Sequence, residues 1–214
     1  SIAMSSLGDF FSGVTGVPPS TLTPPAELLK GTSLDPEKDN VDLIRVYKAS
    51  KDGWSATNFH DRVDGRGSGF VVALMASGQR FGGFSPYGWM STDDYSSSNA
   101  AFLWYADPRN RGEPTRVPIL TGGNTAVYDY ATGGPCFGAA DLQIGPPRAA
   151  VMGGFAGPDA EDTTVNAGDL REGRSSLGGC YDSVTGWPCR GEFKVVEVEV
   201  YCNGNVEVRS VGSR

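Results

Sequence analysis

The stretch Ser50–Trp89 constrains the fold of this chain more than any other. A serine able to cap a helix precedes a short amphipathic run, so we predict a helix over residues 55–63. A glycine-rich turn at 64–67 follows, and the apolar run Phe70–Met75 predicts a strand buried on both faces. A hairpin then leads into residues 81–84, whose two central glycines leave room for a close approach or a bulge. Such a succession indicates a β-rich domain with small helices.

Composition extends this prediction to the whole chain. The 214 residues include 30 glycines and 14 prolines, which is typical of frequent turns and short strands. The clearest strand, Phe193–Cys202, alternates valines on one face with Glu197 and Glu199 on the other. Strand–helix–strand alternation is missing from the pattern. The predicted fold class is therefore mainly β with small helices (α+β), a two-sheet antiparallel β-sandwich.

The sequence divides into three parts. Residues 1–40 predict an N-terminal extension with a short helix near 24–30, whose Leu28 and Leu29 must dock on the domain because so short a helix does not stand alone. The domain itself spans 41–204 and contains a polar, acidic loop insertion at 153–173. Residues 205–214 form a C-terminal tail.

Net charge excludes some function classes. A formal charge of −7 and a pI of about 4.7 argue against nucleic-acid binding, which needs cations to neutralise phosphates. No apolar run approaches the length of about 20 residues that spans a bilayer, so we expect no membrane span. The chain begins with Ser1, and we expect a terminus produced by processing or by cloning.

The four cysteines show no metal-binding pattern. No pair has the spacing of two intervening residues, and the chain has one histidine, so we expect no zinc site. We interpret the cysteines as buried or semi-buried thiols in a reducing compartment, with Cys180 and Cys189 the first pair to suspect if oxidation occurs. Cys136, Cys180 and Cys189 are the candidate redox thiols, because Arg174 and Arg190 lie near the last two in sequence.

Catalytic candidates are few. A serine or cysteine nucleophile would need His60, which we expect to be a surface or cap histidine facing away from Phe59 and Val63. Asp52 and Asp64 each precede a glycine and predict side-chain-stabilised turns. We therefore name no catalytic residue, no metal ligand and no cofactor.

Three tryptophans are candidates for a partner interface. Trp54, Trp89 and Trp187 would mark such a surface if they were exposed together, whereas tryptophans more often anchor a core.

Several motifs, in order, resemble the TLDc domain. They are Tyr47–Ser55 (YKASKDGWS), Phe59 with Asp64–Gly67, Phe81–Trp89 (FGGFSPYGW), Phe102–Leu103, Cys136–Leu142 (CFGAADL), Arg174–Cys180 and Phe193–Tyr201. The resemblance covers roughly residues 43–202 and implies the TLDc type of sandwich. The chain departs from the family at the insertion and at Tyr181-Asp182. We interpret it as a stand-alone member, of plant or algal type.

The resemblance implies protection against oxidative stress, and for several members binding to the vacuolar proton pump or another membrane complex, without an agreed enzymatic mechanism. We expect an intracellular protein, in the plastid (chloroplast) or otherwise cytoplasmic. The leading hypothesis is a non-enzymatic interaction or regulatory domain that docks on a larger protein complex. The alternatives are a thiol-based redox enzyme or peroxide scavenger, and a small-ligand or carbohydrate-binding sandwich.

Overall fold

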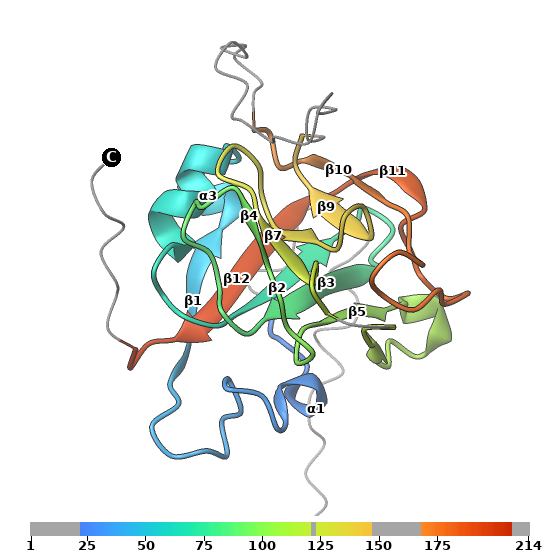
Figure 1. The fold of residues 1–214 in the computed structure, drawn as a ribbon. Coiled ribbons are helices and arrows are strands. Elements are labelled where there is room, and N and C mark those ends of the chain that lie inside the picture. The colour runs from blue at the N-terminus through green and yellow to red at the C-terminus, as the bar shows by residue number, and fades with distance from the viewer. Residues whose placement is uncertain (1–21, 121–122, 147–167, 207–214) are drawn as a thin grey trace, which may run out of the picture.

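Two antiparallel six-stranded sheets make up the part of the chain that the computed structural model describes, residues 22–120, 123–146 and 168–206. The first sheet has the order β1 (Leu43–Lys48), β12 (Glu197–Asn203), β2 (Gly69–Leu74), β3 (Arg80–Ser85), β5 (Phe102–Ala106) and β6 (Thr115–Val117). The second has the order β11 (Gly191–Lys194), β10 (Glu172–Ser175), β9 (Leu142–Ile144), β8 (Cys136–Phe137), β7 (Val127–Asp129) and β4 (Asp94–Ser96). The sheets lie face to face (Figure 1), so the predicted mainly β sandwich is confirmed.

The described segments also include short helices. They are α1 (Ala26–Leu29), α2 (Ala49–Asp52), α3 (Ala56–Val63) and a 3-10 turn at Pro108–Asn110. The predicted helix after Ser55 is α3, which begins with a capping box: the Ser55 hydroxyl accepts from the Asn58 backbone N–H, and the Asn58 side chain accepts from Ser55 N–H.

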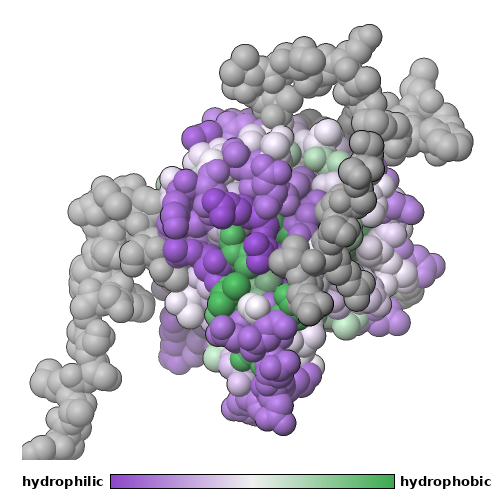
Figure 2. All heavy atoms as spheres, turned by 90° about the vertical axis from the view of Figure 1, so that its left-hand side faces the viewer, coloured by the Kyte–Doolittle hydropathy of each residue, from purple (hydrophilic) through white to green (hydrophobic). Residues whose placement is uncertain are grey.

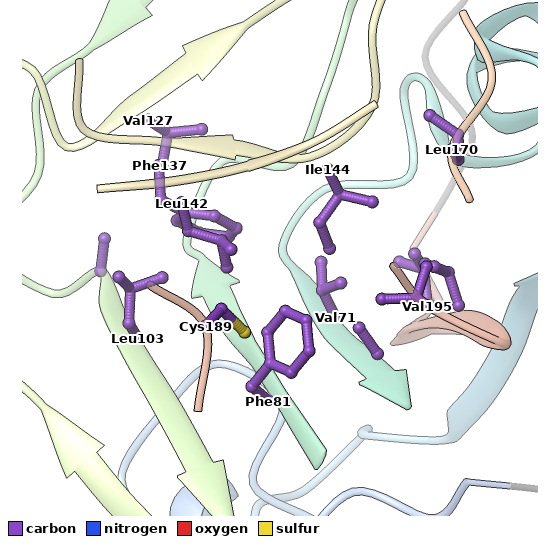
Figure 3. Close-up of a cluster of buried hydrophobic side chains, with 14 of the residues drawn as sticks. Val71, Phe81, Leu103, Val127, Phe137, Leu142, Ile144, Leu170, Cys189 and Val195 are labelled. Atoms are coloured by element: carbon purple, nitrogen blue, oxygen red, sulfur yellow. The ribbon is translucent and has the colours of Figure 1, made fainter. Parts of the chain in front are cut away.

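The main core fills the space between the sheets. Figure 3 shows side chains from both sheets meeting there, with Phe81 of the first sheet and Phe137 and Leu142 of the second fully buried. Gly83 makes this contact possible, because a Cβ at that position would lie 2.6 Å from the Phe137 ring. Gly82 provides the predicted close backbone approach, because a Cβ there would lie 2.0 Å from the Val71 carbonyl oxygen, and the β2–β3 register runs on without a bulge.

A second core lies on the outer face of the first sheet. Phe70, Val72, Phe84 and Trp104 point outward there and are covered by the N-terminal segment, residues 22–34. Leu28 and Leu29 of α1 are buried in this cluster, as predicted. At β2 the sheet therefore packs against apolar side chains on both faces, which explains why this strand has no polar side.

The predicted strand Phe193–Cys202 is two strands in two different sheets, so the single-strand prediction is wrong. Phe193 and Val195 belong to the core between the sheets, and so do Val198 and Val200. The inward positions shift from odd to even numbers at Val195–Val196, and a continuous strand cannot make that shift. The chain leaves β11 here and enters the first sheet as β12.

The strand β1 forms a free edge of the first sheet. Its pairing with β12 is interrupted by a bulge between Arg45 and Tyr47, a device that discourages edge-to-edge association. Figure 2 looks at this side of the molecule and shows a largely hydrophilic surface with a narrow apolar strip at the height of β1. Leu43, Ile44 and Val46 of this strand are partly exposed.

Several predicted features lie outside the described residues. These are most of the insertion at 153–173 and most of the tail at 205–214. Where the description resumes, β10 begins at Glu172, inside the predicted insertion.

Candidate functional site

The candidate redox thiols lie in the core. Cys136, Cys180 and Cys189 are buried and form no disulfide, and Cys202 shares this state. The structure does not gather the three candidates around a shared charge. Figure 3 shows Cys189 beside Phe81, surrounded by apolar side chains. Burial raises the pKa of the Cys189 thiol far above its usual value, and burial raises that of Cys202 to about 12.

Cys180 is held by a carboxylate. Asp141 is buried and accepts three backbone N–H bonds, from Gly179, Cys180 and Tyr181, at 3.0 to 3.1 Å. This fixes the loop that carries the thiol. Burial raises the pKa of Cys180, and the Asp141 charge raises it further. A reactive thiolate needs the opposite electrostatics, a neighbouring cation that lowers the pKa.

The arginines invoked for thiol activation act elsewhere. Arg190 donates to the Val184 carbonyl oxygen at 2.9 Å, and Arg174 is exposed on β10. Neither contributes to the pKa shift of Cys180 or Cys189.

Two of the three candidate interface tryptophans are core residues. Trp89 is 1% exposed and packs edge-on against Phe59, and Trp187 is 4% exposed and donates its indole N–H to Ser175 Oγ at 2.8 Å. Trp54 is partly buried, with the Arg171 guanidinium 4.7 Å from its ring centre. The joint exposure that would mark an interface is therefore not met.

His60 is buried, so the surface or cap position predicted for it is wrong. Its Nδ1 lies 2.8 Å from Asp64 Oδ1, and its Nε2 lies 2.9 and 3.1 Å from the carbonyl oxygens of Tyr130 and Gly133. Burial lowers the pKa of the imidazole, but the Asp64 hydrogen bond and charge outweigh it and the net pKa is raised. Through contacts at both nitrogens, the imidazole ring joins α3 to the turn after β7.

Asp64 and Asp52 also bond to residues outside the turns predicted for them. Asp64 also accepts from Ser91 Oγ at 2.6 Å, which connects the end of α3 to the β3–β4 loop. Asp52 accepts from Lys48 N–H and pairs with Arg62 at 3.1 Å. Among the described residues, no group of three or more histidine, cysteine or acidic side chains could hold a metal ion.

Buried carboxylates on β12 form the densest polar network. Glu197 and Glu199 are fully buried on the outer face of the first sheet, where Lys48 Nζ contacts both, at 3.0 and 2.6 Å. Glu199 also accepts from Leu22 N–H at 3.0 Å and from the Tyr201 hydroxyl at 2.7 Å. The network thus ties the N-terminal segment to β12, the strand next to the edge strand β1.

A groove of about 570 Å³, which sequence reasoning missed, opens on this outer face. It lies between the segment Gly31–Ser33, which follows α1, and the ends of β5 and β6, where Phe102 and Arg116 line it. The Arg116 guanidinium carbon is 3.5 Å from the centre of the Phe102 ring. Because the two walls are some seventy or more residues apart in sequence, no local pattern marks the groove.

Among the described segments, no helix is long and apolar enough to cross a membrane.

The geometry defines the class of protein. It is a two-sheet antiparallel β-sandwich in which the N-terminal segment closes the outer face of one sheet. The family model of the TLDc domain matches residues 25–203, and the chain belongs to this family. The match begins inside the N-terminal segment, at the residue before α1. None of the curated proteins compared with the chain matched it.

Proposed function

We propose that this chain is a non-enzymatic protein-interaction and regulatory domain that contributes to oxidative-stress protection by docking on a larger protein complex. Membership of the TLDc family supports this class of function. The observation that carries the proposal is the state of the reactive side chains. The only imidazole of the chain uses both ring nitrogens in structural bonds, and burial raises the pKa of Cys180, Cys189 and Cys202.

The proposed partner is a membrane-associated assembly, a proton-pumping ATPase being the first candidate. Docking occurs through loops at one end of the sandwich, and the insertion at 153–173 and the N-terminal segment adapt the surface to the partner. The proposed location is intracellular, in a plastid or the cytoplasm. These finer assignments rest on the family resemblance.

A native pull-down tests the proposal. The tagged full chain is incubated with membrane and soluble extracts, crosslinked and purified, and its partners are identified by mass spectrometry. We expect one multi-subunit complex at constant stoichiometry. The purified complex is then titrated with the chain, and a saturable change in its ATP hydrolysis rate is expected. Recovery of no stable partner counts heavily against the proposal.

Peroxide consumption tests the rival thiol hypothesis. The wild-type chain is compared with a variant in which all four cysteines are alanine, and with the four single variants in case the quadruple one does not fold. We expect equal, negligible turnover throughout, because buried thiols of raised pKa supply little thiolate. Turnover that disappears with one cysteine would establish the rival function.

A further inference from the structure

The groove beside Phe102 has the composition of a binding site. Its volume of about 570 Å³ lies in the range of small-ligand and peptide sites, and it is open to solvent. Ile119 is the accessible apolar residue of its lining, above the buried rings of Phe84 and Phe102, while Thr32, Asn99 and Arg116 add a few polar groups. Prolines and small residues make up most of the remaining wall, so the backbone is accessible there.

Arg116 is the charged group of this site. It makes no ion pair with any residue in the described part of the chain, and burial lowers its pKa. In the antiparallel β5–β6 register it lies opposite Trp104, and its guanidinium contacts the Phe102 ring. A guanidinium on a ring face keeps its planar set of N–H donors available for a carboxylate, which it binds in a bidentate manner.

The open groove suits a segment of polypeptide better than an enclosed small molecule. One wall is formed by β6 and the residues after it. Among the described strands β6 pairs with β5 alone, whereas Pro118 and Leu120, beyond its end, are bonded to Asp182 and Cys180. The net charge of the chain also limits which peptide segments could bind in the groove. A net charge of −7 repels a long acidic tract, whereas one carboxylate flanked by apolar side chains gains the local contact with little long-range repulsion.

We propose that this groove binds a segment of a protein partner, with one aspartate or glutamate side chain on Arg116 and an adjacent apolar side chain against Ile119. The inference rests on the proposed function, because it names the surface that such an interaction domain uses. Two other occupants make different predictions. One is a free organic carboxylate, and the other is the chain's own segment 1–21, in which Asp9 is flanked by apolar residues.

The test is an NMR titration of the isotopically labelled full chain. The probe is the blocked peptide acetyl-Gly-Leu-Glu-Leu-Gly-amide, and its glutamine counterpart is the matched control ligand. The signals followed are the Arg116 side-chain N–H, the Phe102 ring and the Ile119 methyl groups. We expect saturable shifts with the glutamate peptide and binding about tenfold weaker with the glutamine peptide, as for loss of one charged hydrogen-bonded pair.

Protein variants locate the effect. R116Q removes the difference between the two peptides, and R116K, which keeps the charge but not the fork, leaves an intermediate affinity. R80Q is the matched control. Arg80 lies on β3 of the same sheet, outside the groove lining, and makes no ion pair with the described residues. R80Q is expected to bind both peptides like the wild type.

Four outcomes overturn the inference. The first is the absence of saturable binding, and the second is equal affinity for the two peptides. The third is that sodium acetate alone causes the same shifts. The fourth is that the variant D9N shifts the Arg116 side-chain signal and binds the peptide more tightly than the wild type. The third would assign the groove to a free carboxylate and the fourth to the chain's own segment. Repeating the pull-down with R116Q separates this inference from the proposed function: a complex recovered unchanged would refute the groove and leave the interaction domain standing.

Discussion

His60 shows what sequence cannot reveal about a single residue. Its neighbours Asp61 and Arg62 are exposed, and its place on a short helix fits a solvated position. Its acceptors on the turn after β7 lie 70 and 73 residues away, so local sequence cannot place them. The same holds for Gly83, whose lack of a side chain could be read from the sequence while the ring that needs the space could not.

The raised pKa of His60 predicts a pH-dependent contribution to stability. Because the folded-state pKa lies above the unfolded value of 6.5, the stabilisation is fully present below pH 6.5 and is lost as pH rises through the folded pKa. H60A should lower the free energy of unfolding by about 2 kcal/mol at pH 6, since buried acceptors lose a charged donor, and by less at pH 9. Urea unfolding at both pH values measures this difference.

The imidazole titration is the control for this prediction. His60 is the only histidine, so its ring carbon signals report the folded pKa directly. An imidazole that titrates below 6.5, or an H60A cost that grows with pH, would refute the protonated bridge.

Elements were predictable where their patterns are local, and β12 marks the limit. The helix α3 and the buried strand β2 follow from a capping serine and an apolar run. The sequence does not reveal the break between β11 and β12, because apolar and polar residues alternate on both sides of it. Glu197 and Glu199 looked solvent-facing, yet they are buried because cations of β1 and a backbone N–H of the N-terminal segment, more than 140 residues away, come to meet them.

Removing the shared cation of this network should be costly. K48M leaves two fully buried carboxylates without their common partner, and we expect a loss of about 3–5 kcal/mol in the free energy of unfolding. Adding E199Q should recover part of this loss, because glutamine still accepts from Leu22 and Tyr201.

The matched control for K48M is K194M. Its ion pair with Glu172 is exposed, and its loss should leave the free energy of unfolding close to the wild-type value. Equal costs for the two lysines would contradict the role of burial.

The N-terminal segment acts as part of the domain. Leu29 is 1% exposed in the outer core, so L29A should cost about 2–5 kcal/mol in chemical denaturation, by lost burial and the cavity left behind. The neighbouring exposed Lys30 provides the control, with K30A expected to stay within about 0.5 kcal/mol of the wild type. A cost below about 1 kcal/mol for L29A would instead describe residues 22–34 as a detachable arm.

At the scale of the whole molecule, the described thiols and the imidazole lie in the interior, whereas the surfaces open to a partner lie on the outside. The thiols and the imidazole are buried, whereas the groove, the edge strand β1 and the hydrophilic face of Figure 2 are accessible. The fold class could be predicted from the sequence because turns, glycines and alternation repeat along the chain. The groove could not, because it exists only where the N-terminal segment meets β5 and β6.

This arrangement predicts that the thiols react only when the molecule opens. With a neutral aromatic disulfide reagent in native buffer, Cys136, Cys189 and Cys202 should be modified at rates set by the unfolding equilibrium, because each is buried and forms no disulfide. Cys180 lies on a loop and should react first, yet slowly, since burial and Asp141 raise its pKa. D141N, which weakens the acceptor of three backbone N–H groups, should speed modification of Cys180 while leaving Cys189 near its original rate.

Fast reaction of any thiol in the native wild type would contradict the core placement and reopen the thiol hypothesis. Modification that follows unfolding in denaturant would make oxidation of these residues a consequence of damage, so that the proposed protection against oxidative stress would have to come from what the domain binds.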